Sequence, residues 1–306
     1  MKRARSVMTI QNELEPLIAR AAAALPKVRA VTSPLSSNIF GRVVLRFTLA
    51  AFESEAQLRL LRTGGLRDAL IAASTAAASR SSAEAWCRAM DSLVGLDDLF
   101  VTGGVRDAMA AVGRHVATRA GCQSFLTALR HLVCNQDRAR FFATAPIRDA
   151  MIAVSAVVTK ETCVDWTDAL GMMARLDSER VRVMLGTQSM KNALVAVSEH
   201  VDSSNGCMRW CAVLGLLSRS PQNVQLFGSC AAVRDALVSM SRHALNCTDA
   251  ATMWCLSIEL LTETDRRNQR LFRTIAVRDA LIAVRPFANC DLAPAGSNVA
   301  RLFRRR

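Results

Sequence analysis

The sequence predicts an all-α fold, a solenoid built from about six helical repeats of roughly 42 residues. Two observations favour it: a short motif recurs through most of the chain, and an aromatic residue follows nearly every copy at an almost constant distance. A third observation argues against strands. Apolar and polar residues do not alternate over any long stretch, Ala and Leu dominate, and tyrosine is missing.

The recurring motif is a basic residue, an Asp or Asn and then an apolar run, as in VRDALIAV. Within it Val277, Leu281 and Val284 recur at helical spacing, and Gly64–Gly65 and Gly103–Gly104 are expected to break the chain just before the helix. Successive basic residues are 39, 42, 43, 43 and 44 positions apart. These basic residues are Arg67, Arg106, Arg148, Lys191, Arg234 and Arg278.

Two further landmarks recur at a nearly constant distance from the motif. The aromatic residue comes 18 to 20 positions after the basic residue in the first five copies, at Trp86, Phe125, Trp166, Trp210 and Trp254. A large apolar residue comes six or seven positions before it, at Leu61, Phe100, Phe142, Leu185, Phe227 and Phe272. Each repeat is therefore predicted to hold a short helix, a second helix on the motif and a third helix with the aromatic residue.

This order of helices resembles the armadillo repeat. The resemblance covers about residues 55–285 and rests on N-x-x-L-F, then G-G-V or a variant, then an L-I-A-V helix, then A-x-W-C. It implies a right-handed α-solenoid of armadillo-like three-helix repeats, with HEAT-like two-helix repeats as the alternative. We expect a basic helical cap at 1–27, the solenoid with a degenerate first repeat at 28–285, and an incomplete terminal repeat with a basic tail at 286–306.

Composition indicates a folded intracellular protein. With 51% hydrophobic and 21% charged residues, 306 residues can bury a large core. No long apolar run predicts a membrane span, and Glu13 and Glu15 interrupt the start where a signal peptide would be apolar. We expect a cytoplasmic or nuclear protein that is not secreted. Ten cysteines without a C-x-x-C pair predict free, mostly buried thiols.

The charge suggests an alternative function. The net charge is +13, and arginines gather ahead of the motif and at both ends of the chain. Such charge attracts nucleic acid, anionic lipid or acidic protein, so electrostatic nucleic-acid binding or a nuclear-transport-type adaptor is the alternative. No aromatic residues alternate with the arginines ahead of the motif, so base stacking is not expected. Those arginines are Arg138, Arg140, Arg180, Arg182, Arg266, Arg267, Arg270 and Arg273.

The basic residues of the motif form a ladder with the acids that follow them. A row of cations could track a phosphate backbone or an acidic peptide. We expect a structural role instead, in which each aspartate lies in the first turn of its helix, stabilises the helix dipole and pairs with an arginine of the neighbouring repeat. The aspartates of this ladder are Asp68, Asp107, Asp149, Asp235 and Asp279.

The aromatic row is expected to face the core. In the armadillo nuclear-import adaptors, third-helix tryptophans form a concave groove for basic peptides, aided by an asparagine one turn later. Here the residues one turn later are apolar, and a basic chain suits a Lys/Arg peptide poorly. Those residues are Met90, Leu129, Leu170, Leu214 and Ile258.

No enzymatic site is predicted, and no cofactor or metal site. His115, His200 and His243 each stand nine residues after a motif arginine or lysine, and we expect them at the C-terminal end of a second helix, where a cation suits the dipole. They fall in different repeats, too far apart to share a metal. No catalytic triad, Cys-His pair or phosphate-binding loop motif is present.

The predicted function is a protein-interaction scaffold. Stacked repeats leave an extended concave surface for a peptide or helix. We expect the contact at exposed polar positions of the third helices, and self-association through the C-terminal end if its apolar face is not capped. The candidate contact residues are Arg88, Asp91, Asp168, Arg209 and Glu259.

Overall fold

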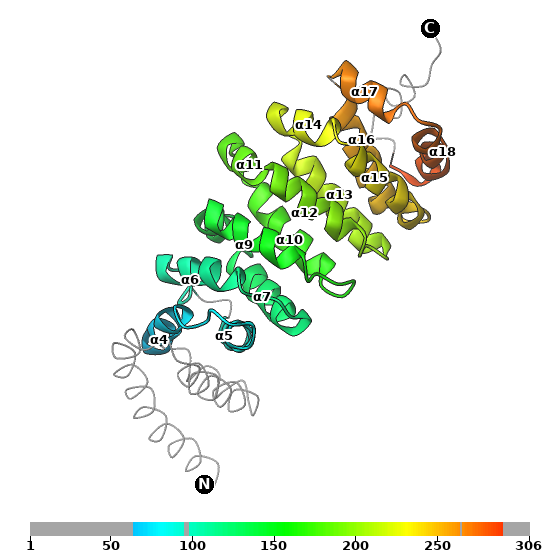
Figure 1. The fold of residues 1–306 in the computed structure, drawn as a ribbon. Helices are drawn as coiled ribbons and strands as arrows, with labels where there is room; N and C mark the ends of the chain where they lie inside the picture. Colours follow the sequence, from blue (N-terminus) through cyan, green and yellow to red (C-terminus); the bar gives the residue numbers. More distant parts are fainter. Residues whose placement is uncertain (1–63, 95–97, 264, 290–306) are drawn as a thin grey trace. The chain divides into compact units, whose positions relative to one another are not determined.

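The described chain is entirely helical. The structure is a computed structural model that describes residues 64–94, 98–263 and 265–289 (Figure 1). Within these ranges it has fifteen α-helices, labelled α4 to α18, one 3-10 turn and no strand. The all-α prediction is therefore confirmed for the described residues.

Several predictions fall outside these ranges. They are the N-terminal cap at 1–27, the degenerate first repeat around 28–52, and the terminal segment from residue 290 onward. Leu61, the first of the apolar landmarks, and Cys290, one of the ten cysteines, also lie outside the described residues.

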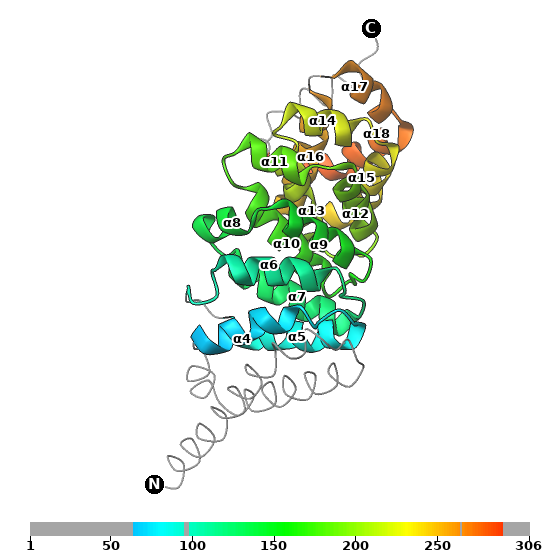
Figure 2. The ribbon, with the colours of Figure 1, turned by 60° about the vertical axis from the view of Figure 1, so that its left-hand side comes forward.

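The N-terminal compact unit spans residues 1–132. In its described part, α4 packs against α6 and α5 packs against α7, so second helices lie beside second helices and third helices beside third helices (Figure 2). The bounds are α4 (Gly64–Ser74), α5 (Arg80–Leu93), α6 (Gly103–Gly113) and α7 (Arg119–Leu132).

The C-terminal compact unit spans residues 133–306. Up to residue 289, its helices run short, second and third in three successive rounds, followed by a further short and second helix. The short helices are α8 (Gln136–Phe142), α11 (Glu179–Leu185), α14 (Pro221–Gly228) and α17 (Arg266–Phe272). The second helices are α9 (Ala145–Ser155), α12 (Gln188–Ser198), α15 (Ala231–Ala244) and α18 (Ile275–Val284), and the third helices are α10 (Cys163–Ala174), α13 (Ser204–Leu217) and α16 (Thr248–Thr262).

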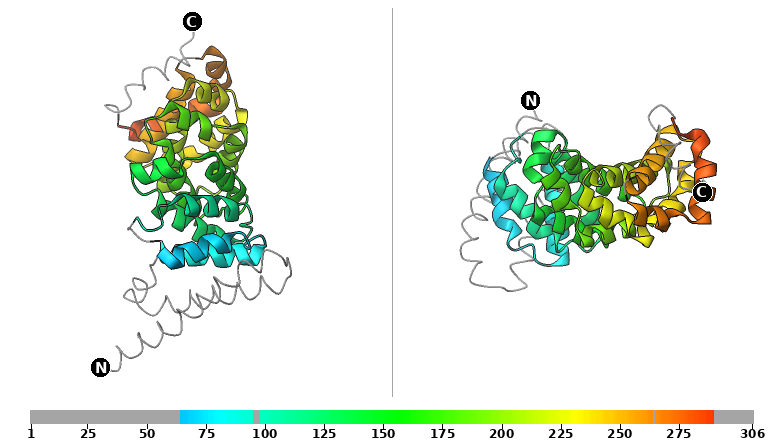
Figure 3. Two further views of the ribbon diagram at one scale, coloured as in Figure 1. Left: turned by 90° about the vertical axis from the view of Figure 1, so that its left-hand side faces the viewer. Right: turned by 90° about the horizontal axis from the view of Figure 1, so that it is seen from above.

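Neighbouring repeats of the C-terminal unit stack in chain order. Helices α9, α12, α15 and α18 pack one against the next, and so do α10, α13 and α16. The colours from green to orange follow one another in this order in both views of Figure 3. The 3-10 turn η1 (Arg285–Phe287) packs against α16 and α18.

Two sequence expectations are wrong around α6. The segment before it is not a short helix in the described residues, because Asp98–Phe100 form only a turn. The paired glycines do not break the chain but begin the helix, since Thr102 caps it by accepting a hydrogen bond from the Val105 amide. The helix start packs closely on α4: a Cβ on Gly104 would lie 2.7 Å from Cδ1 of Ile71, whose side chain would have to move.

Four buried tryptophans tie the third helix of a repeat to its second helix. Trp86, Trp166, Trp210 and Trp254 are all fully buried. Each indole N–H donates to a main-chain carbonyl three residues after the basic residue of the motif. The bonds are Trp86 to Leu70 at 2.8 Å, Trp166 to Met151 at 3.0 Å, Trp210 to Leu194 at 2.8 Å and Trp254 to Leu237 at 2.7 Å.

Phe125 holds the same position in α7. It is fully buried like the tryptophans, but its ring has no donor. The core placement expected for the aromatic row is thus observed, and the indole hydrogen bond is an addition that the sequence analysis did not foresee.

Two buried asparagines connect successive short helices. The Asn223 amide donates to the Arg182 carbonyl of α11 at 2.8 Å and to the Leu217 carbonyl at 3.0 Å. The Asn268 amide makes the same two bonds one repeat later, to Val224 at 3.1 Å and Leu261 at 2.9 Å. Both side chains are fully buried, so each bond is made away from water.

Glycines make room for these asparagines. A Cβ on Gly186 would overlap the side-chain amide of Asn223, and a Cβ on Gly228 would overlap that of Asn268. The residue that ends one short helix must therefore be small where the next short helix carries asparagine.

Replacing Trp210 with phenylalanine should measure the indole hydrogen bond, because phenylalanine already fills this position in α7. We expect Trp210→Phe to lower the free energy of unfolding by about 1–2 kcal/mol, through one lost hydrogen bond and a small cavity. Trp210→Ala should cost about 3–5 kcal/mol. Urea denaturation followed by circular dichroism measures both, and an unchanged midpoint for Trp210→Phe would contradict the assignment.

Candidate functional site

The motif ladder is an internal structure of each repeat. Each arginine pairs with the aspartate that directly follows it, and not with an aspartate of the neighbouring repeat as expected. The Nη2–Oδ1 distances are 2.8 Å for Arg67–Asp68, 2.8 Å for Arg106–Asp107, 2.6 Å for Arg148–Asp149, 2.6 Å for Arg234–Asp235 and 3.0 Å for Arg278–Asp279. The predicted pairing between repeats is therefore wrong.

The helix-dipole role expected for the aspartates is also wrong. Each aspartate is the fifth residue of its helix, and no acidic residue lies in the first turn of any of these helices. Two of these helices begin earlier than expected because a threonine caps them. Thr102 and Thr274 each accept a hydrogen bond from an amide three residues later, as Thr187 does for α12.

Three of the arginines reach the next repeat through its main chain. Arg148 Nη1 donates to the Met184 carbonyl at 2.9 Å, at the end of the short helix α11. Arg67 and Arg234 make the equivalent contacts to Leu99 at 3.4 Å and Leu271 at 3.3 Å, which are longer and weaker. A guanidinium neutralised by its own aspartate and bound to a carbonyl has little capacity left for a ligand, so we treat the ladder as structural.

Lys191 is the exception in the ladder. It lies in α12 with only 9% of its surface exposed, and the residue after it is Asn192 rather than aspartate. The Asn192 side chain instead accepts a hydrogen bond from Gln188 at 3.1 Å.

Some of the polar third-helix residues predicted to contact a partner form ion pairs within the chain. Asp168 of α10 and Arg209 of α13 form an ion pair at 3.0 Å. Arg88 pairs with Glu84 of its own helix at 2.6 Å. Asp91 and Glu259 lie partly exposed on α5 and α16. Of the five predicted contact residues, the structure thus brings together only Asp168 and Arg209.

An apolar surface that the sequence analysis missed surrounds this ion pair. Its residues occupy the positions two before, two after and six after the tryptophan on α10, α13 and α16. All are partly exposed except Thr252, which is buried. We call this surface the third-helix face, formed by Val164, Asp168, Met172, Met208, Ala212, Leu216, Thr252, Leu256 and Leu260.

The same positions are polar in the N-terminal unit. There α5 carries Glu84, Arg88 and Ser92, and α7 carries Gln123, Thr127 and His131. Counting from the aromatic landmark along the sequence would have revealed this contrast. The residues one turn after the aromatics, from Met90 to Ile258, are buried as the expected core position requires.

The histidines do not act as cationic caps in the way expected. His115 and His200 lie two residues beyond α6 and α12, and their main-chain amides cap Val112 and Val197. His243 lies in the last turn of α15, where burial and the Arg242 charge lower its pKa. Its Nε2 accepts a hydrogen bond from Arg242 at 3.0 Å, which requires a neutral ring.

Most cysteines are buried free thiols. Burial raises the pKa of Cys87 and Cys211 well above the ordinary range, and raises that of Cys163 to about 11. Cys134 is exposed beside Arg138. Among the described residues, no cluster of three or more His, Cys, Asp or Glu side chains could hold a metal ion, and no helix in these ranges has the length and hydrophobicity to cross a membrane.

Comparisons with known proteins add no support to the resemblance to armadillo repeats, which rests on the repeated motif alone. No model of a known protein family matches this chain, and no curated protein is significantly similar to it.

Removing the Arg148 guanidinium should lower the free energy of unfolding more than removing the charge of its partner Asp149. We expect Arg148→Gln to lower the free energy of unfolding by about 1 kcal/mol, because it loses the bond to the next repeat. Asp149→Asn should cost about 0–0.5 kcal/mol, since the pair is partly exposed and the amide oxygen still accepts. Chemical denaturation of both variants tests this, and a larger loss for Asp149→Asn would refute it.

Alkylation should separate the exposed thiol from the buried ones. In the native protein at pH 8, iodoacetamide should modify Cys134 and leave Cys87 and Cys211 intact, because only an accessible thiolate reacts. Peptide mass spectrometry before and after addition of denaturant reports each site. Rapid native labelling of Cys87 or Cys211 would show that the cores of α5 and α13 open readily.

Proposed function

We propose that this chain is an armadillo-like interaction scaffold that binds a segment of a partner protein along its third helices. The observation that supports it is the third-helix face of the C-terminal unit. Leu214 and Ile258 are fully buried on the same helices, whereas Leu216, Leu256 and Leu260 remain partly exposed. Apolar side chains left open in register on adjacent helices are typical of a binding surface.

The chemistry of this face suits an amphipathic partner. On α13, Met208, Ala212 and Leu216 follow one another at intervals of four residues, which gives an apolar stripe along the helix. Met172 and Met253 lie partly exposed on the flanking helices. Methionine side chains adapt to different apolar shapes, so the face favours a helix or extended segment with apolar anchors.

Charge on the face would orient the partner rather than attract it. The Asp168–Arg209 ion pair lies beside the apolar stripe. Glu259 adds a partly exposed carboxylate on α16. Pairs of this kind contribute to specificity more than to affinity.

Site-specific crosslinking tests the proposal. A photo-crosslinking amino acid at Leu256 should capture a discrete protein from native lysate, resistant to nuclease and to high salt. The same amino acid at Val183, a partly exposed residue of the short helix α11, is the matched control and should not capture that protein.

Substitution on the face completes the test. Leu216→Ser combined with Leu256→Ser should reduce recovery of the captured protein about ten-fold, the effect of removing interface anchors. Val183→Ser should leave recovery unchanged. Undiminished capture by the double variant, with its helical content intact, would rule out this face as the binding surface.

A further inference from the structure

Helix α17 differs from the other short helices of the C-terminal unit in its outward surface. Four positions are compared, aligned on the apolar residue near the end of each helix. All four are exposed in α17, whereas in α11 and α14 the last of them is a buried glycine, Gly186 or Gly228. In α8 they hold Gln136, Asp137, Arg140 and Ala143; in α11, Glu179, Arg180, Val183 and Gly186; in α14, Pro221, Gln222, Gln225 and Gly228. In α17 they hold Arg266, Arg267, Arg270 and Arg273.

The comparison with α8, α11 and α14 shows whether packing of a short helix requires arginine at these positions. The four compared residues of α8, α11 and α14 carry no net charge, and those helices pack in their repeats without it. The inward residues of α17 do the packing, since Asn268 and Phe272 are fully buried. The stacking of the repeats therefore does not require arginine at any of the four outward positions.

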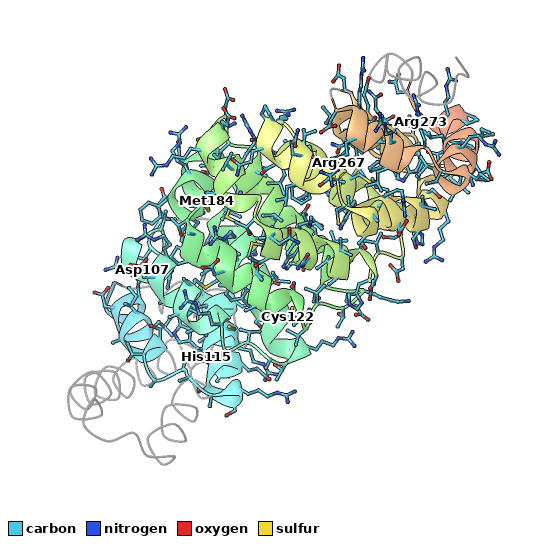
Figure 4. The ribbon with its side chains drawn as sticks, turned by 45° about the horizontal axis from the view of Figure 1, so that its top comes forward. Asp107, His115, Cys122, Met184, Arg267 and Arg273 are labelled. Atoms are coloured by element: carbon cyan, nitrogen blue, oxygen red, sulfur yellow. The ribbon has the colours of Figure 1, made fainter. Side chains whose placement is uncertain are left out.

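The four guanidinium groups have no carboxylate partner within the described residues. All four residues are exposed, and no ion pair joins them to an acid in that part of the chain. The nearest carboxylate along the chain, Asp265, accepts hydrogen bonds from the Arg267 amide at 2.7 Å and from Gln225 at 3.0 Å. Figure 4 labels Arg267 and Arg273, which mark this surface on the molecule.

The predicted basic edge along the short helices is narrower than the sequence suggested. Arg138 is buried, and Arg182 donates to the Leu176 carbonyl at 3.0 Å, so neither adds to an open cationic surface. Arg140 and Arg180 are exposed but stand beside Asp137 and Glu179 on their own helices. Among the short helices in the described ranges, α17 is the one in which all four compared positions are arginine.

We propose that the outward face of α17, formed by Arg266, Arg267, Arg270 and Arg273, binds the phosphate backbone of a nucleic acid. Arg266 and Arg273 are about 10 Å apart along the helix axis, which spans about three phosphates at the roughly 3.4 Å rise of one strand. Guanidinium groups bind phosphate oxygens in bidentate fashion. This role is separate from the third-helix face of the proposed function and involves none of its residues.

The make-up of the surface favours phosphodiester over the other anionic partners. Hot spots of protein–protein interfaces combine arginine with buried aromatic residues, and the four positions supply arginine without an aromatic neighbour. Among the described residues the exposed large apolar side chains are Ile275 and Ile282 of α18. Ile275 follows Arg273 by two residues, so the experiment below includes anionic vesicles to distinguish a lipid surface from a phosphodiester backbone. Without aromatic residues, binding should be insensitive to base sequence.

The experiment compares two double variants of the full chain that lose the same charge. Arg267→Gln with Arg270→Gln gives α17 the residues that α14 carries at these positions, Gln222 and Gln225, so folding should be preserved. Arg140→Gln with Arg180→Gln is the matched control. Fluorescence anisotropy with a mixed-sequence 20-nucleotide single strand measures affinity across a range of salt concentrations.

The α17 variant should bind about ten-fold more weakly at low salt, and its log–log salt slope should be shallower by about 1.4, the value for two lost phosphate contacts on a single strand. The control should match the wild-type slope. Equal losses in both variants would overturn the proposal in favour of general charge. So would an unchanged slope in the α17 variant, or selective binding to phosphatidylserine vesicles in place of the nucleic acid.

Discussion

Hydrogen bonds from side chains to main-chain carbonyls hold this helical array together. Tryptophan joins the third helix to the second within a repeat, and arginine and asparagine join one repeat to the next. These carbonyls already accept within helices or lie at helix ends, where acceptors are left over. Because Asn268 is fully buried, replacing it with an apolar residue would lose two hydrogen bonds made away from water, at about 0.5–1.5 kcal/mol each.

This arrangement separates the residues that build the stack from those available for binding. The ladder arginines are neutralised inside their own repeats, so the charge that stands out in the sequence is mostly structural. Two surfaces are the binding candidates among the described residues: the third-helix face of the C-terminal unit, whose Thr252 is buried and accepts a hydrogen bond from the Asn289 amide at 2.9 Å, and the outward face of α17. One is apolar and the other purely cationic, which favours two different ligands on separate helices.

The regular features were predictable because periodicity encodes them. The helical content and the burial of Trp166 and Phe125 follow from their constant distance to the motif. The helix starts were misjudged because capping by Thr102 moves the beginning of α6 onto the glycines. That shift places Asp107 in the second turn, out of reach of the dipole role it was expected to have.

The hydrogen bonds between repeats could not be predicted, because their acceptors are main-chain carbonyls, which every residue has. Nothing about Met184 marks its carbonyl as the partner of Arg148. Asn268 was noticed only as part of a repeated motif, and the room made for it by Gly228 became visible in the structure. The third-helix face was not predicted because charged residues were taken as the contact sites. Its apolar members lie at fixed distances from each tryptophan, so they could have been identified along the sequence.

The ladder arginines bind main-chain carbonyls, so the residue that supplies the carbonyl can have any side chain. The acceptors reached by the ladder arginines are Leu99, Met184 and Leu271, and the bond would form with almost any residue there. A copied repeat therefore meets a ready acceptor in its new neighbour without a compensating substitution. An array joined in this way can grow, shrink or reorder by gene duplication while its surfaces diverge, which fits repeats that keep the motif and its register but differ in their third-helix faces.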